Sequence, residues 1–254
     1  MIIIGCSITF IATILGAAIV FFFKKDFSGK TNSIISGFSA GVMVAASIWG
    51  LLLPSISYAS YLEKFSFVPA LVGVIVGSLF LVIIDAITKH INNSSKNPLA
   101  PEKLKLTRFV IAFTVHNIPE GLAVGFAFGT ALASASSSSF LTAMGLAIGI
   151  AIQNIPEGAA VALPVYKQTG SKAKGFLWGT ISGIVEPICA VLGVLLASTI
   201  EALLPWFLAF SAGAMIFVSI EDLIPEAKYS ASHLGTWSFI LGFLVMMVLD
   251  IALG

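Results

Sequence analysis

Charged residues are scarce in this chain. Asp, Glu, Lys and Arg make up 10% of its 254 residues, whereas a soluble domain carries about 25%. Hydrophobic residues reach 58%, and a soluble fold of this size cannot hide that much apolar surface from water. The net charge of +1 lacks the basic excess typical of nucleic-acid binding. The composition therefore predicts an all-α polytopic membrane protein and argues against a nucleic-acid partner.

Three further absences narrow the function. The two cysteines, Cys6 and Cys189, lie in apolar segments and are expected to be buried hydrophobes without a disulfide framework. No nucleotide-binding string occurs, so any transport is expected to be passive or coupled to another ion. Met1–Phe23 has no basic residues ahead of its long apolar stretch, so it is expected to remain as the first membrane helix.

Apolar runs of about 20 residues, the length that crosses a hydrocarbon core of ~30 Å, occur eight times. The predicted spans are Ile2–Phe23, Ile34–Leu53, Phe67–Thr88, Phe109–Gly129, Phe140–Pro164, Gly175–Ala197, Leu203–Leu223 and Leu234–Leu253. Every basic residue except Lys64 falls in the connections after spans one, three, five and seven. Because cytoplasmic loops concentrate Lys and Arg, this pattern predicts a multi-pass protein of the inner (cell) membrane with both termini outside the cytoplasm.

Two pairs of segments indicate an internal repeat. Phe38–Met43 in span two resembles Phe210–Met215 in span seven, and residues 81–85 in span three resemble residues 246–250 in span eight. Corresponding spans are five apart and cross in opposite directions, which is the inverted repeat of many transporters. The alternative is that small-residue patterns recur in any packed membrane helices. The predicted single domain is a 3+2+3 bundle with repeat one at about 1–88, a central helix pair at about 109–164 and repeat two at about 175–254.

The most informative feature is a six-residue string that occurs twice within apolar spans. The copies are His116-Asn117-Ile118-Pro119-Glu120-Gly121 and Gln153-Asn154-Ile155-Pro156-Glu157-Gly158. A carboxylate at membrane depth costs a few kcal/mol, so its repeated presence indicates function. Residues three and four apart share a helix face. Each string therefore predicts one cluster of polar ligands, and the two helices together predict one site.

Prolines are expected to add main-chain ligands to this site. Pro119 has no N–H and so frees the carbonyl of Val115, while Pro156 frees that of Ile152. In span six, Glu186 precedes another proline and brings a third buried carboxylate. Its alternative role is a packing carboxylate paired to an amide.

The ligand types point to a divalent metal ion. Oxygen ligands with one imidazole suit borderline ions such as Zn²⁺, Fe²⁺, Mn²⁺, Co²⁺ and Cd²⁺, which would be transported cargo and not a cofactor. Glu120 and Glu157 are placed to bridge two ions. Met43 joins the set only if span two approaches, its alternative role being packing. The candidate ligands are Met43, His116, Asn117, Glu120, Gln153, Asn154, Glu157 and Glu186.

Acidic residues near the cytoplasmic ends of spans three and seven have two interpretations, solvated interfacial charges or a metal exit path. The residues of that possible exit path are Asp85, His90, Glu221 and Asp222. Asp250, near the outer end of span eight, is expected to be solvated.

These residues resemble those of the ZIP (Zrt/Irt-like) family of divalent metal transporters, in particular its bacterial GufA-like branch. The likeness covers essentially the whole chain, including both strings and the Glu-Pro pair of span six. It implies a binuclear centre, net metal movement into the cytoplasm and no enzymatic activity. The first implied site is Met43, His116, Glu120, Gln153 and Glu157, and the second is Asn117, Glu120, Asn154, Glu157 and Glu186. By a weaker match, the resemblance also implies a cytoplasmic exit path at Asp85, His90, Glu221 and Asp222.

Two positions depart from the family pattern. Many members carry His where this chain has Gln153, and some carry Asp where it has Asn154. Both changes weaken the case for tight zinc selectivity. The His-rich loop between spans three and four is reduced here to His90.

Two other functions compete with metal transport. An intramembrane metalloprotease usually needs a His-Glu-x-x-His string, which this chain lacks. A proton- or Na⁺-coupled carrier of an organic solute would use the carboxylates as relays, but no Lys or Arg lies at mid-membrane to hold an anionic substrate. Exposed small-residue faces would permit a homodimer.

Overall fold

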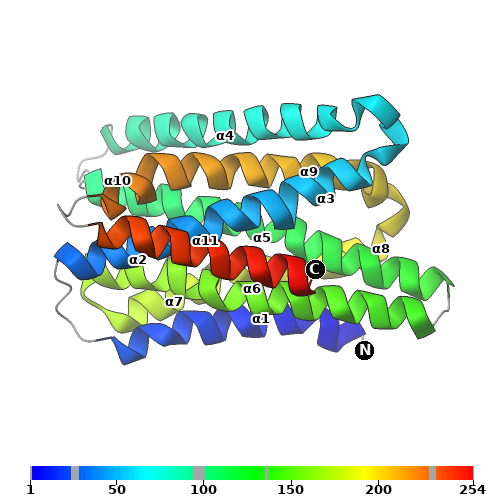
Figure 1. The fold of residues 1–254 in the computed structure, drawn as a ribbon, viewed down its shortest axis with the longest axis horizontal. Coiled ribbons are helices and arrows are strands. Elements are labelled where there is room, and N and C mark those ends of the chain that lie inside the picture. Colours follow the sequence, from blue (N-terminus) through cyan, green and yellow to red (C-terminus); the bar gives the residue numbers. More distant parts are fainter. Residues whose placement is uncertain (1, 24–28, 94–100, 135–136, 229–232, 254) are drawn as a thin grey trace.

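The structure is a computed structural model that describes residues 2–23, 29–93, 101–134, 137–228 and 233–253. These residues are nearly all helical, with no strand among them. Eight helical stretches within them are long and apolar enough to cross a membrane, which confirms the eight predicted spans. They lie side by side along the long axis of the molecule (Figure 1). Lys24, Lys25 and Lys96, which contributed to the predicted orientation, lie outside the described residues.

Several spans are built from more than one helical segment. Span one is α1 (Ile2–Ala18) with η1 (Ile19–Phe22), and span two is α2 (Gly29–Ala45), the π-helical η2 (Ala46–Leu52) and α3 (Leu53–Tyr58), followed by η3 (Ser60–Phe65). Spans three to five are α4 (Phe67–Asn93), α5 (Pro101–Ser134) and α6 (Ser137–Thr169). Span six is α7 (Lys172–Gly183) and α8 (Val185–Leu195), span seven is α9 (Ala197–Val218), the π-helical η4 (Ser219–Leu223) and α10 (Ile224–Ala227), and span eight is α11 (Leu234–Leu253).

The two helices that carry the strings are the longest. α5 has 34 residues and α6 has 33, so each is about 50 Å long at 1.5 Å per residue and extends beyond a ~30 Å hydrocarbon core. Both remain helical through Pro119 and Pro156. The strings therefore lie near the middle of continuous helices, with several turns on either side.

The helices pack in four close pairs: α1 with α6, α5 with α8, α2 with α11 and α4 with α9. Glycines set the spacing in these pairs. A Cβ at Gly16 would lie 2.1 Å from the carbonyl oxygen of Ile155, and one at Gly41 would lie 2.1 Å from that of Phe239. Only a hydrogen side chain permits such contact between helix backbones. α4, at the top of Figure 1, forms one edge of the molecule and exposes many large apolar side chains, as a lipid-facing helix does.

Span eight ends before its neighbouring helices do. In Figure 1 the C-terminal end of α11 stops short of the right-hand ends of α5 and α6. The last turn of α11 therefore lies level with a part of α5 and α6 that is short of their ends, and in that turn Asp250 is buried whereas Ile251 and Ala252 are exposed.

Candidate metal centre

The two strings meet at a buried cluster of one imidazole and two carboxylates. His116 Nε2 lies 3.2 Å from Glu120 Oε1 on its own helix and 3.2 Å from Glu157 Oε2 on α6. All three side chains are buried, and one ligand atom from each lies within 4.8 Å of the other two. Within the described residues this is the only such group of three His, Cys, Asp or Glu side chains. The two strings thus come together as the sequence predicts.

Beside this cluster, Glu186 is held by groups from two other helices. Its Oε2 accepts a hydrogen bond from Asn154 Nδ2 (2.7 Å), and its Oε1 accepts one from Thr13 Oγ1 (2.8 Å). Glu186 lies in the first turn of α8, where the helix dipole favours a negative charge. Glu186 is therefore paired to an amide, and it is fixed at the edge of the cluster.

The two asparagine amides are oriented by protein acceptors. Asn117 Nδ2 donates to the carbonyl oxygen of Ser182 at 2.8 Å, and Asn154 Nδ2 donates to Glu186 as described. An amide has one donor end and one acceptor end, so both asparagines keep their Oδ1 for another partner. Asn154 Oδ1 is buried and has no hydrogen-bond partner among the described residues.

Several buried polar atoms here have no partner in the part of the chain that the structure describes. They are His116 Nδ1, Glu120 Oε2, Asn154 Oδ1, Glu157 Oε1 and Asp250 Oδ2. Buried polar atoms are normally hydrogen-bonded. The unpaired oxygens gathered here are hydrogen-bond acceptors that have no donor within the described ranges. This arrangement is chemically suited to a cation, and it matches the nitrogen and oxygen ligands that divalent metal ions take.

The glycine that ends each string brings another helix against it. A Cβ at Gly121 would lie 2.4 Å from the main-chain oxygen of Glu186, and one at Gly158 would lie 2.2 Å from that of Thr13. No larger residue fits at either contact. These glycines therefore place Glu186 and Thr13 beside the ligands of the strings.

One expectation about free carbonyls is wrong. Pro119 does leave the Val115 carbonyl without its helical partner, but Ser211 Oγ on α9 donates to that oxygen at 3.3 Å. The Val115 carbonyl thus ties α5 to α9 and is not a free ligand. A freed carbonyl inside a packed bundle attracts a hydroxyl from the neighbouring helix, which sequence spacing cannot show.

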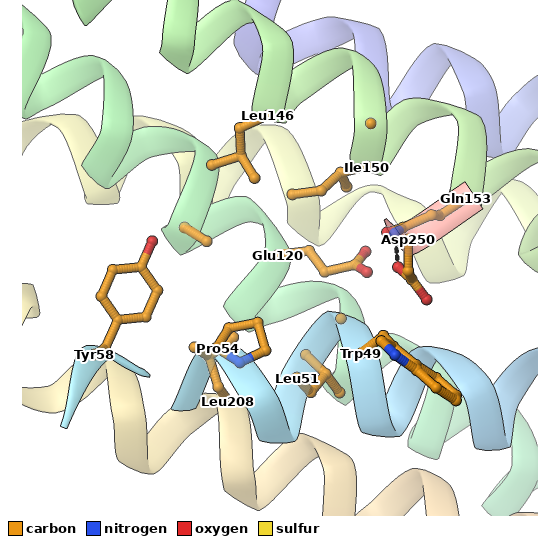
Figure 2. A pocket seen from close by; sticks show the side chains of 13 residues that line it. Trp49, Leu51, Pro54, Tyr58, Glu120, Leu146, Ile150, Gln153, Leu208 and Asp250 are labelled. Atoms are coloured by element: carbon orange, nitrogen blue, oxygen red, sulfur yellow. Dashed lines mark hydrogen bonds between the residues drawn. The ribbon is translucent and has the colours of Figure 1, made fainter. Parts of the chain in front are cut away.

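The expectation that Asp250 is solvated is also wrong. Asp250 is 7% exposed, and its Oδ1 accepts a hydrogen bond from Gln153 Nε2. Glu120, Gln153 and Asp250 line one cavity of about 170 Å³ that also reaches Trp49 and Tyr58. Figure 2 shows the bonded pair with the Glu120 carboxylate beside it. The signal that was missed is the one used for Glu186, a lone carboxylate in an apolar run.

The remaining candidates lie on other helices than the two that carry the strings. Met43 is fully buried on α2 within the largest apolar cluster. Asp85 forms an ion pair with Lys89 at 2.6 Å, and His90 is exposed. Glu221 and Asp222 lie in η4, where Glu221 is exposed and Asp222 is half-buried. Thr13, Ser182 and Ser211 are the supporting residues that sequence reasoning did not identify.

The fold and this cluster define a polytopic helical membrane protein with a buried site of metal-ligand type. A family model described as ZIP Zinc transporter matches residues 92–250. Zinc transporter ZIP11 of Xenopus tropicalis is 36% identical over 99% of this chain and 96% of its own length. The chain belongs to the ZIP family, as its residues predict, and the family consists of transporters and not enzymes.

Two bacterial relatives are similar over much of their length. Zinc transporter ZIPB of Bordetella bronchiseptica is 33% identical over 99% of this chain and 81% of its own length. Zinc transporter GufA of Myxococcus xanthus is 33% identical over 72% of this chain and 70% of its own length.

Proposed function

We propose that this protein carries divalent transition-metal ions, zinc above all, across the membrane into the cytoplasm. The observation that carries the proposal is the buried His116–Glu120–Glu157 cluster, whose carboxylates retain oxygens without partners among the described residues. Charged groups inside a membrane-spanning bundle lower its stability, so those that are present indicate a functional site. Relatives named zinc transporters support zinc as the cargo.

The proposed centre holds two ions side by side. The proposed ligands of the first ion are Met43, His116, Glu120, Gln153 and Glu157. Those of the second ion are Asn117, Glu120, Asn154, Glu157 and Glu186. The orientation of the asparagines supports this division, because their amide nitrogens are tied to protein acceptors and their oxygens remain for an ion. Three carboxylates partly neutralise two divalent charges, so the ions are held without being trapped.

The cavity supplies the proposed route from the outer face. It reaches from Tyr58, at the outer end of span two in the predicted orientation, to Glu120 and Gln153 at the site. On the cytoplasmic side the proposed exit passes Asp85, His90, Glu221 and Asp222. This route would run the length of the bundle from one water face to the other.

The helix pairing supports the proposed inverted repeat. In this repeat, span one corresponds to span six, two to seven, three to eight and four to five. The helix pair α1–α6 therefore corresponds to the pair α5–α8. In the same way α2–α11 corresponds to α4–α9, and all four pairs are closely packed. Each copy of the Ser-Ala-Gly segment is also followed within a few residues by a π-helical stretch, η2 or η4. Two unrelated halves of the chain would have no reason to share these features.

Metal uptake by proteoliposomes tests the proposal. Zn²⁺, Cd²⁺, Mn²⁺ and Fe²⁺ would be offered to wild type, to Glu120→Ala and to Glu63→Ala, which removes an exposed carboxylate outside the site. We expect uptake by wild type and Glu63→Ala and none by Glu120→Ala. Absence of uptake by folded, inserted wild type would favour a coupled solute carrier instead.

A further inference from the structure

Asp250 is a buried carboxylate that lines the proposed outer route but is not one of the proposed metal ligands. It lies near the end of α11, and a Cβ added at Gly50 of η2 would lie 3.5 Å from its Oδ1. The same oxygen accepts the hydrogen bond from Gln153 Nε2 on α6. Three helices thus meet at this carboxylate, and one of them, α6, carries the proposed metal ligands Gln153, Asn154 and Glu157.

We propose that Asp250 is a positioning residue that fixes the amide of Gln153 so that its carbonyl oxygen is presented to the metal ion. This inference rests on the proposed function, in which Gln153 is a ligand of the first site. In this bond the Oδ1 of Asp250 is the acceptor, and only the NH₂ end of an amide can donate. Asp250 therefore holds the NH₂ end of the amide and turns the oxygen away from itself, toward the rest of the cavity.

The position of Glu120 explains why this orientation matters. Glu120 lines the same cavity, and its Oε2 is buried without a partner among the described residues. Freed from Asp250, the Gln153 NH₂ group would have this carboxylate as an alternative acceptor. That bond would turn a donor toward the ion site and occupy a ligand oxygen, and the metal would have to break it. By holding the Gln153 NH₂ group, Asp250 keeps both the Glu120 carboxylate and the Gln153 carbonyl oxygen available to the metal ion.

Asp250 also has a second oxygen, Oδ2, which is buried and has no partner in the described part of the chain. The competing interpretation is that this oxygen binds the metal directly. The two roles differ in what they need, because positioning requires a hydrogen-bond acceptor whereas direct binding requires the charge. The substitution Asp250→Asn separates them, since its side-chain oxygen can still accept from Gln153 but carries no charge.

Zinc uptake by proteoliposomes, measured as kcat and KM, tests the inference with Asp250→Asn, Asp250→Leu and Asp250→Ala. Partners that orient metal ligands are worth about 10- to 100-fold in affinity. We expect KM to rise at least about 10-fold in the Leu and Ala variants with kcat nearly unchanged, the pattern of lost binding. The Asn variant should stay close to wild type. Thermal unfolding of each purified variant would show whether it folds. If Asp250→Leu does not fold, Asp250→Ala replaces it in the comparison.

A double-mutant cycle with Gln153→Ala completes the test. If Asp250 acts through Gln153, Asp250→Ala should change KM in the wild-type background and add nothing once Gln153 is removed. Equal damage by Asp250→Asn and Asp250→Ala, fully additive effects, or a wild-type KM for Asp250→Ala would each overturn the positioning role. Failure of wild type to take up zinc would instead refute the proposed function, so the two failures are distinguishable.

Discussion

Thr13 offers a sharp test of how the proposed second site is held together, because it touches the site without being a candidate ligand. Its hydroxyl lies 2.8 Å from Glu186 Oε1 and 3.2 Å from the carbonyl of Thr9 one turn earlier. The single hydroxyl proton serves the shorter contact best. Thr13→Val removes this donor and changes the volume little, so it isolates the hydrogen bond to the carboxylate.

The size of the effect follows from the burial of Glu186. A hydrogen bond to a charged group contributes about 1.5–3 kcal/mol, which corresponds to about 10- to 150-fold in an equilibrium constant. Partners that orient metal ligands show a similar range of about 10- to 100-fold. We therefore expect Thr13→Val to weaken one zinc-binding step at least about 10-fold while the step at His116 persists.

Isothermal titration of the purified protein with zinc would resolve the two steps, and uptake KM would follow the weaker one. Thr114→Val is the matched control, since the Thr114 hydroxyl bonds only the Val110 carbonyl of its own helix among the described residues. The control should bind zinc as wild type does. If Thr13→Val binds and transports zinc normally, the hydrogen bond to Glu186 does not support the site and the reasoning is refuted.

Four other outcomes are expected. His116→Ala should reduce uptake of Zn²⁺ more than that of Mn²⁺, because zinc favours imidazole nitrogen; parallel uptake assays measure the ratio. Gly158→Ala should lower thermal stability by about 1–3 kcal/mol or prevent folding, since its Cβ would lie 2.2 Å from a main-chain oxygen. Ser211→Ala should cost about 0.5–1.5 kcal/mol by removing the donor to a partly buried carbonyl, seen as a lower unfolding temperature. Lys167→Ala, which breaks a partly exposed ion pair with Glu226, should change stability by less than about 1 kcal/mol and leave zinc uptake unchanged.

The spans and the central cluster were predictable because each depends on local spacing. Apolar length decides the number of spans, and the i, i+4 relation brings His116 to Glu120 within one helix. The meeting of Glu120 and Glu157 followed from the repetition of a costly string, which indicates one shared site. These inferences required no knowledge of which helices are neighbours beyond the central pair.

The errors concern contacts between helices distant in sequence. The Val115 carbonyl was expected to be free, but it accepts a hydrogen bond from Ser211, 96 residues away. The position of Asp250 near the end of a span predicts solvation, but α11 stops short of the ends of α5 and α6 and Gln153 donates a hydrogen bond to Asp250. A hydropathy profile gives the length of each span and not its depth relative to its neighbours, so neither contact was predictable from spacing.

The proposed repeat also explains why the site has an odd number of glutamates. Gly121 packs on the main-chain oxygen of Glu186, and Gly158 packs on that of Thr13, so Thr13 and Glu186 would be equivalent positions of the proposed repeat. A glutamate at both positions would add one more carboxylate to Glu120, Glu157, Glu186 and the nearby Asp250, with stronger mutual repulsion when no ion is bound and slower release of a bound one. With threonine at one position, its hydroxyl stabilises the Glu186 carboxylate instead of repelling it. The asymmetry would thus keep Glu186, a ligand of the proposed second site, oriented while limiting the negative charge that a departing ion must leave behind.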